Sequence, residues 1–165
     1  MSSLTQSRQA LFGGTQPWPA FIAVNDTVRG GKSSSSWRTD THNRGQFQGV
    51  LDTTALGGAG FASQSATFQR LEIDNQALGL ELSLVASENK GSEKNPNIFT
   101  LVLKNERAKT RPDGRRESVL SYEFSFSAPT HHEQLIFAPW TAFQATYRGR
   151  RQKDAPPLDP HNIKE

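Results

Sequence analysis

Three stretches of the sequence carry residue types that could do chemistry, and the first ends like a phosphate-binding loop. Gly31-Lys32-Ser33 matches the last part of Gly-x-x-x-x-Gly-Lys-Ser/Thr, in which backbone N–H groups and a lysine hold nucleotide phosphates. That motif requires a glycine five positions before its second glycine, and Asp26 stands there. It also requires a helix to begin at once, and the serine run 33–36 is a poor helix former. The sequence therefore argues against an NTPase.

The second stretch, His131-His132-Glu133, offers three metal-ligating side chains in a row. Neighbouring residues of a strand point to opposite faces, so adjacent side chains cannot easily hold one ion. His42 and His161 are too isolated in the sequence to complete a set by inspection. We therefore expect a surface loop before a strand here, and we predict neither a metal site nor another cofactor.

Catalytic arrangements are equally hard to build from the other polar residues. No Gly-x-Ser-x-Gly pattern marks an activated serine. Carboxylate pairs such as Asp52 with Asp74, or Glu72 with Asp74, would serve glycoside hydrolysis only if they met across a cleft. Chance spacing is the default explanation, so we predict no catalytic residue.

The third stretch is the basic run 104–116. The net charge of the whole chain is only +3, and its positive charge is concentrated in this run and in residues 148–153. Interspersed acidic residues favour a solvated loop tip, but a loop that grips an acidic protein surface or phosphates stays open. No aromatic residue lies between the basic ones, which makes nucleic-acid binding unlikely. Arginine is enriched at binding hot spots. The candidate contacts with a partner protein are Arg115, Arg116, Arg148, Arg150 and Arg151.

Length and composition place these residues in one globular domain. A chain of 165 residues with ten Phe, three Trp and two Tyr can bury a real core. The absence of cysteine excludes disulfides, thiolate nucleophiles and Cys-based zinc sites. No apolar run is long enough to cross a membrane. We predict a flexible or short helical N-terminus over residues 1–10 and a single domain over 11–165.

Short alternating segments separated by turn residues predict an all-β sandwich or barrel. The clearest strands are 78–84 and 120–126, each with apolar residues on one face. Residues 98–103 are apolar on both faces except for Thr100, which predicts a central strand. Weaker strands are expected at 21–24, 47–51, 61–67 and 134–137. Only residues 141–145 favour a helical turn inside the domain.

Four stretches also follow a characteristic order. The first, 24–33 followed by Ser36-Trp37, looks like Asn-Asp-x-Val-x-Gly-Gly-x-Ser, and the second is 47–52 leading into the glycine-rich 56–63. The third is Tyr122-Glu123-Phe124, then Pro139-Trp140 and Phe143, and the fourth is 147–150, then 154–159 and 162–164. From about Leu11 to the last residue, the chain resembles the complex I intermediate-associated protein 30 family.

This resemblance implies a galactose-binding-like jelly roll, a β-sandwich of two antiparallel sheets, in agreement with the strand pattern. It implies a non-enzymatic, chaperone-like factor that binds assembly intermediates of respiratory complex I (NADH:ubiquinone oxidoreductase). Family domains usually continue beyond Asn-x-Ile-Lys, which leaves open whether closing strands are lacking and whether an open sheet edge permits self-association. The family indicates a mitochondrial protein, whereas the lack of a convincing presequence indicates a cytoplasmic one; both are intracellular.

The opening motif has a functional and a structural interpretation. Asn25, Asp26, Arg29 and Lys32 would line a ligand- or partner-binding loop, or Asp26 would brace a turn instead. The turn glycines are Gly30, Gly31, Gly57, Gly58 and Gly60. The structural interpretation is favoured for this loop. An alternative function is a small-ligand or carbohydrate-binding module, recruited as an enzyme in a specialised pathway, which would expose Trp18, Trp37 or Trp140 as a stacking platform.

Overall fold

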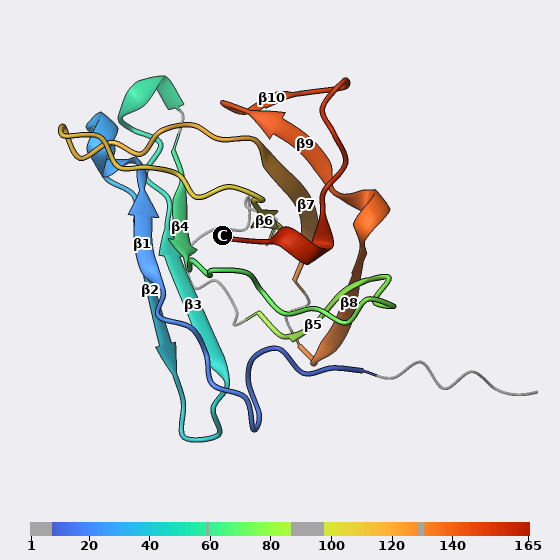
Figure 1. Ribbon diagram of the computed structural model, residues 1–165. Coiled ribbons are helices and arrows are strands. Elements are labelled where there is room, and N and C mark those ends of the chain that lie inside the picture. The colour runs from blue at the N-terminus through green and yellow to red at the C-terminus, as the bar shows by residue number, and fades with distance from the viewer. Residues whose placement is uncertain (1–7, 59, 87–97, 129–130) are drawn as a thin grey trace, which may run out of the picture. The chain divides into compact units, whose positions relative to one another are not determined.

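The computed structural model describes residues 8–58, 60–86, 98–128 and 131–165 (Figure 1). Within these ranges the regular structure consists of antiparallel strands and four 3-10 turns, with no α-helix. The predicted all-β class is confirmed, and the sheets are consistent with a β-sandwich. No helix of the described residues has the length and apolar character of a transmembrane segment. Of the predicted N-terminal segment, residues 1–7 lie outside the described residues.

The chain divides into two compact units, which are described separately. Unit 1 comprises Met1–Phe68 and Thr110–Arg116, and unit 2 comprises Gln69–Lys109 and Glu117–Glu165. Each unit is assembled from two segments of the chain, and the second segment of unit 1 lies between the two segments of unit 2 in the sequence. The single domain expected over residues 11–165 stays a prediction.

Unit 1 is built from two antiparallel strand pairs and two 3-10 turns. Strand β1 pairs with β4, and β2 pairs with β3 in a hairpin. The strands are β1 (Ile22–Asn25), β2 (Ser34–Thr39), β3 (Gly45–Val50) and β4 (Ala62–Ser65), and the turns are η1 (Asp26–Arg29) and η2 (Leu56–Gly58). The weak patterns thus predicted β1, β3 and β4, whereas the serine-rich β2 was not predicted as a strand.

An aromatic cluster forms the packed interior of unit 1. The ring of Trp37 lies with its centroid 4.3 Å from that of Phe21 and 4.9 Å from that of Trp18. The Trp18 indole N–H donates to the Asn43 carbonyl at 2.8 Å. A Cβ at Gly45 would lie 2.3 Å from a Trp37 ring atom, so only glycine lets the backbone approach this closely. Both tryptophans therefore serve packing.

Asp40 organises the turn between β2 and β3. One carboxylate oxygen accepts the N–H groups of His42 and Arg44, each at 2.9 Å, and the other accepts Nε of Arg44 at 2.7 Å. These bonds, the Arg44 N–H foremost, lower the pKa of Asp40 to about 2 from its ordinary value of 3.8. The charged carboxylate is therefore the form that the folded hairpin favours.

We predict that Asp40 contributes acid sensitivity. Because its pKa is lower in the folded than in the unfolded chain, the stabilisation is present above about pH 4 and is lost as the pH falls towards 2. In Asp40→Asn, denaturant unfolding should therefore depend less on pH between about 4 and 2 than in the parent protein. Asp113→Asn, which removes a carboxylate from an exposed turn, is the control for the loss of one negative charge.

Unit 2 holds a four-stranded sheet of order β10-β9-β7-β6 and the pair β5-β8. The strands are β5 (Gly79–Leu84), β6 (Ile98–Leu103), β7 (Ser121–Ser127), β8 (Gln134–Pro139), β9 (Gln144–Tyr147) and β10 (Arg150–Arg151), and the 3-10 turns are η3 (Trp140–Ala142) and η4 (Pro160–Asn162). The predicted strands 78–84, 120–126 and 134–137 are confirmed as β5, β7 and β8. In place of the helical turn expected over 141–145, the chain forms η3, which is shorter and begins one residue earlier in the sequence.

The prediction of a central strand over 98–103 is wrong. Within the described residues, β6 ends its sheet and pairs only with β7. Its alternate residues Phe99, Leu101 and Leu103 face inward, while Ile98 and Val102 remain 57% and 39% exposed. Apolar residues on both faces of this strand therefore do not mark burial on both sides.

The core of unit 2 is closed by a segment that forms no strand, the C-terminal strap (residues 156–165). Ile163 is fully buried and packs with Leu103 and Tyr122. The strap is tied by main-chain bonds, since the Ile163 carbonyl accepts the Leu71 N–H at 2.8 Å and the Lys164 N–H donates to the Lys104 carbonyl at 2.9 Å. Main-chain hydrogen bonds thus hold this segment to the core although it belongs to no sheet.

Side chains fasten the strap further. The Asn105 amide donates to the carbonyls of Asp159 and Asn162, at 2.7 and 3.1 Å, and its oxygen accepts the Asp159 N–H. The Tyr122 hydroxyl donates to the Pro156 carbonyl at 3.0 Å. Lys104 and the buried carboxylate of Glu165 form an ion pair at 2.8 Å. The strap is thus an integral layer of the core.

We predict that Ile163→Ala destabilises the protein by about 2–5 kcal/mol, because it opens a cavity in a fully buried site. The matched control is Ile98→Ala, which removes the same atoms from an exposed strand position and should cost less than about 1 kcal/mol. Denaturant unfolding measures both. Equal losses would contradict the structural role of the strap.

Candidate functional site

The opening loop of unit 1 is built around the buried carboxylate of Asp26, which is 1% exposed. One oxygen accepts the Ser33 N–H at 3.0 Å, and the other accepts the Ser33 hydroxyl at 2.8 Å and the Phe61 N–H at 3.3 Å. The Ser33 hydroxyl oxygen in turn accepts the Asp52 N–H at 3.1 Å. Asp26 and Ser33 therefore join three separate chain segments.

Two glycines of the opening motif serve this carboxylate in different ways. Gly30 ends η1 with φ of 87°, the left-handed region that glycine adopts without strain. Gly31 instead supplies room, because a Cβ there would lie 2.2 Å from the Asp26 carboxyl carbon. Gly60 likewise lies against the Asp26 and Ser33 side chains, whereas Gly57 and Gly58 have positive φ values of 66° and 91°.

The structure separates the four candidate residues of this loop into two pairs. The Asn25 side-chain oxygen accepts the Ser35 hydroxyl at 2.8 Å and the Ser63 N–H at 3.2 Å, so it braces β1 against its neighbours, as Asp26 braces the loop. Arg29 and Lys32 are exposed. The binding role of this loop stays a prediction, and Arg29 and Lys32 are its two exposed candidates.

Exposed apolar residues lie in the three chain segments that the Asp26 network joins, and the sequence analysis did not single them out. Val28, Leu51 and Phe61 are 51%, 61% and 38% exposed. The Arg29 guanidinium lies 5.9 Å from the Phe61 ring centroid, within range of a cation–π contact. We name Val28, Arg29, Lys32, Leu51 and Phe61 the loop rim. Apolar residues next to the turn glycines were the signal that could have revealed it.

The two arginine groups lie in different units. In unit 1, Arg115 is exposed and lies 3.9 Å from the Asp113 carboxylate. Arg116 is half-buried, and its backbone forms an isolated antiparallel β-bridge with Thr110. In unit 2, Arg148, Arg150 and Arg151 are all exposed on the β9–β10 hairpin.

The turn of this hairpin consists of Arg148 and Gly149, with φ values of 51° and 73°. Two positive values in a two-residue hairpin turn define type I′, which favours Asn-Gly or Gly-Gly. Arg148 therefore holds a backbone conformation that disfavours its side chain. Its guanidinium lies 5.4 Å from the Tyr147 ring centroid.

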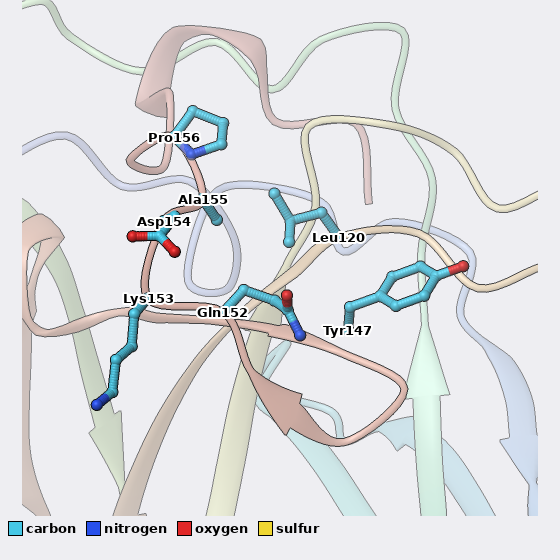
Figure 2. A pocket seen from close by; sticks show the side chains of 7 residues that line it. All are labelled: Leu120, Tyr147, Gln152, Lys153, Asp154, Ala155 and Pro156. Carbon is cyan, nitrogen blue, oxygen red and sulfur yellow. The ribbon is translucent and has the colours of Figure 1, made fainter.

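An open hollow of about 360 Å³ adjoins the same hairpin. Figure 2 shows Leu120, Tyr147 and Gln152 around it, and the Lys153 amine pointing away from Tyr147. Its remaining lining residues are Asp154, Ala155 and Pro156. A second hollow of about 220 Å³ also lies in unit 2, along the strap at Tyr122, Pro156 and Pro157.

Residues 10–165 match the family described as complex I intermediate-associated protein 30 (CIA30). The chain belongs to this family. It is also 35% identical over 161 residues to the uncharacterized protein C9E9.15 of Schizosaccharomyces pombe (strain 972 / ATCC 24843), a match that covers 93% of this chain and 70% of the relative. No solved structure matches the chain.

In this CIA30 protein, the aromatic residues named in the sequence analysis are packed. Trp18, Trp37 and Trp140 are half-buried, and the Trp140 indole N–H donates to the Ala77 carbonyl at 2.6 Å. The Trp140 ring lies 6.2 Å from that of Phe143. Neither of the two hollows is lined by a tryptophan. This arrangement weakens the carbohydrate alternative.

Metal-ligating residues do not converge in the part of the CIA30 chain that the structure describes. No three of its His, Asp and Glu side chains group closely enough to hold an ion. His131 and His132 are exposed before β8. The predictions that the protein has no metal, cofactor or catalytic residue remain predictions.

We predict that Asp26→Asn destabilises the protein by about 2–3 kcal/mol, because an amide nitrogen must then face a buried N–H or O–H donor. The matched variant Asp113→Asn alters an exposed carboxylate and should change the unfolding free energy by less than about 1 kcal/mol. If the parent and Asp26→Asn unfolded at the same denaturant concentration, Asp26 would not brace the loop.

Proposed function

We propose that this CIA30 protein is a non-enzymatic, chaperone-like assembly factor that binds an intermediate of complex I. Membership of a family described as complex I intermediate-associated carries the proposal. The proposal includes a mitochondrial location, where assembly of respiratory complex I takes place. The Schizosaccharomyces pombe relative is itself uncharacterized, so it adds no independent support for a particular partner.

The loop rim is the surface of unit 1 through which we propose that the partner binds. Phe61 and Arg29 belong to the aromatic and arginine residue types that are enriched at protein interfaces, and the exposed Val28 and Leu51 add apolar area that a partner can bury. The buried Asp26 network beneath fixes the loop backbone before binding. A preformed loop loses little conformational entropy on association, so more of the contact energy appears as affinity.

The test is a pull-down of the tagged protein from mitochondria of its own host, read by mass spectrometry. The protein should recover complex I subunits or assembly factors, and the double variant Arg29→Ser with Leu51→Ser should recover about tenfold less. Both positions are exposed, so the fold should persist.

The matched control is Arg38→Ser with Ile22→Ser, which removes an exposed cation and an exposed aliphatic residue from the strands of unit 1. It should bind like the parent. Equal losses in both double variants would exclude the loop rim as the binding surface. Absence of every complex I subunit and assembly factor from the parent pull-down would refute the assembly role.

A further inference from the structure

The outer edge of β10 carries backbone groups that its own sheet does not use. Strand β10 ends the four-stranded sheet, with Arg150 opposite Tyr147 and Arg151 opposite Thr146. The next N–H, of Gln152, donates inward to the Ala145 carbonyl at 2.8 Å. Successive N–H groups of an antiparallel strand point to opposite sides, so the Arg151 N–H and C=O point away from β9.

Positive charge is concentrated along this edge. Between residues 148 and 154 the chain carries Arg148, Arg150, Arg151 and Lys153 against one acidic residue, Asp154, and all five are exposed. Because neighbouring strand residues point to opposite faces, Arg150 and Arg151 place a cation on each face of the edge. A strand added here would meet cations on both sides.

The conformation of Arg148 is a second, independent observation. A type I′ turn is served better by Asn or Gly at this position, and left-handed backbone disfavours the arginine side chain. Strain of this kind in a sparsely populated region is concentrated at functional sites. The turn therefore holds a cation where folding alone favours a different residue.

We propose that the β10 edge binds an acidic, extended segment of a partner protein as an added strand. This inference rests on the proposed protein-binding function and specifies the chemistry of the partner. Main-chain bonds to Arg151 would supply affinity, and the surrounding cations would select acidic residues. The hollow lined by Leu120, Tyr147 and Gln152, which adjoins the hairpin, would receive one apolar side chain of the segment.

A second copy of this chain is a poorer occupant of the same edge. Two β10 strands placed edge to edge would bring Arg150 and Arg151 of each copy together, and like charges on paired strands are destabilising. Short, charged edge strands are also a means by which sheets avoid pairing with their own kind. The same charges attract an acidic strand.

The test uses the whole protein and a fluorescent ten-residue peptide of alternating Glu and Val, measured by anisotropy. The peptide should bind, more weakly as salt is raised, whereas peptides of alternating Lys and Val, or of Glu and Pro, should not. Arg148→Asn removes a cation and relieves the turn, so it should leave the thermal midpoint equal or higher while weakening peptide binding about threefold.

A pair of variants separates strand addition from simple charge attraction. Arg151→Ser removes the cation and keeps the outward N–H, and Arg151→Pro removes both; proline is tolerated where the N–H faces outward on an edge strand. We expect Arg151→Pro to bind the Glu–Val peptide about fivefold more weakly than Arg151→Ser. Equal affinities, with both variants folded by circular dichroism, would overturn strand addition.

Two other outcomes would also overturn the proposal. If the parent protein did not bind the Glu–Val peptide, the β10 edge would be only a protected edge. If the pull-down still recovered complex I subunits in that case, the assembly role would stand and the partner would bind another surface. A dimer by sedimentation that Arg151→Pro dissociates would assign the edge to a second copy.

Discussion

The burial of one carboxylate is the constraint on which the described unit 1 depends. Asp26 cannot be sheltered from water without several donors, and those donors come from the residue before β2 and the residue before β4. Satisfying the charge therefore fixes the spacing of these segments and demands glycine at position 31, while Gly60 packs closely against the same carboxylate. The exposed side chains of the loop rim are presented by backbone that this network holds in place.

Unit 2 also holds a buried carboxylate, that of Glu165, which pairs with Lys104 instead of bracing a loop. Its core is closed by the strap, whose proline carbonyls accept the Tyr122 hydroxyl and whose peptide groups pair with residues 71 and 104. Irregular chain held by main-chain hydrogen bonds therefore covers part of the core of this unit. The four-stranded sheet of this unit has β6 at one end and β10 at the other, and β10 is short and positively charged.

The all-β class could be predicted from the sequence because alternating residues such as those of β5 and β7 report burial of one face. Strand β2 was not predicted because its serines lack that alternation. Strand β6 was wrongly predicted to be central because the exposed Ile98 and Val102 are of residue types that are usually buried. The motif located the opening loop and favoured Asp26 as a brace. Which of its residues face outward depends on hydrogen bonds to Ser63 and Phe61, more than 30 positions away, which no local pattern contains.

The strap also bears on how the protein is made. Its Ile163 carbonyl bonds to Leu71, and 163 − 71 gives 92 positions that a ribosome must add between these two residues. At about 5–20 residues per second, that takes roughly 5–20 seconds. Strands β6 and β7 are made within this interval, and from the completion of β7 until Ile163 is added their apolar face lacks its cover. A protein proposed to assist the assembly of others would therefore itself present a nascent chain that chaperones can bind.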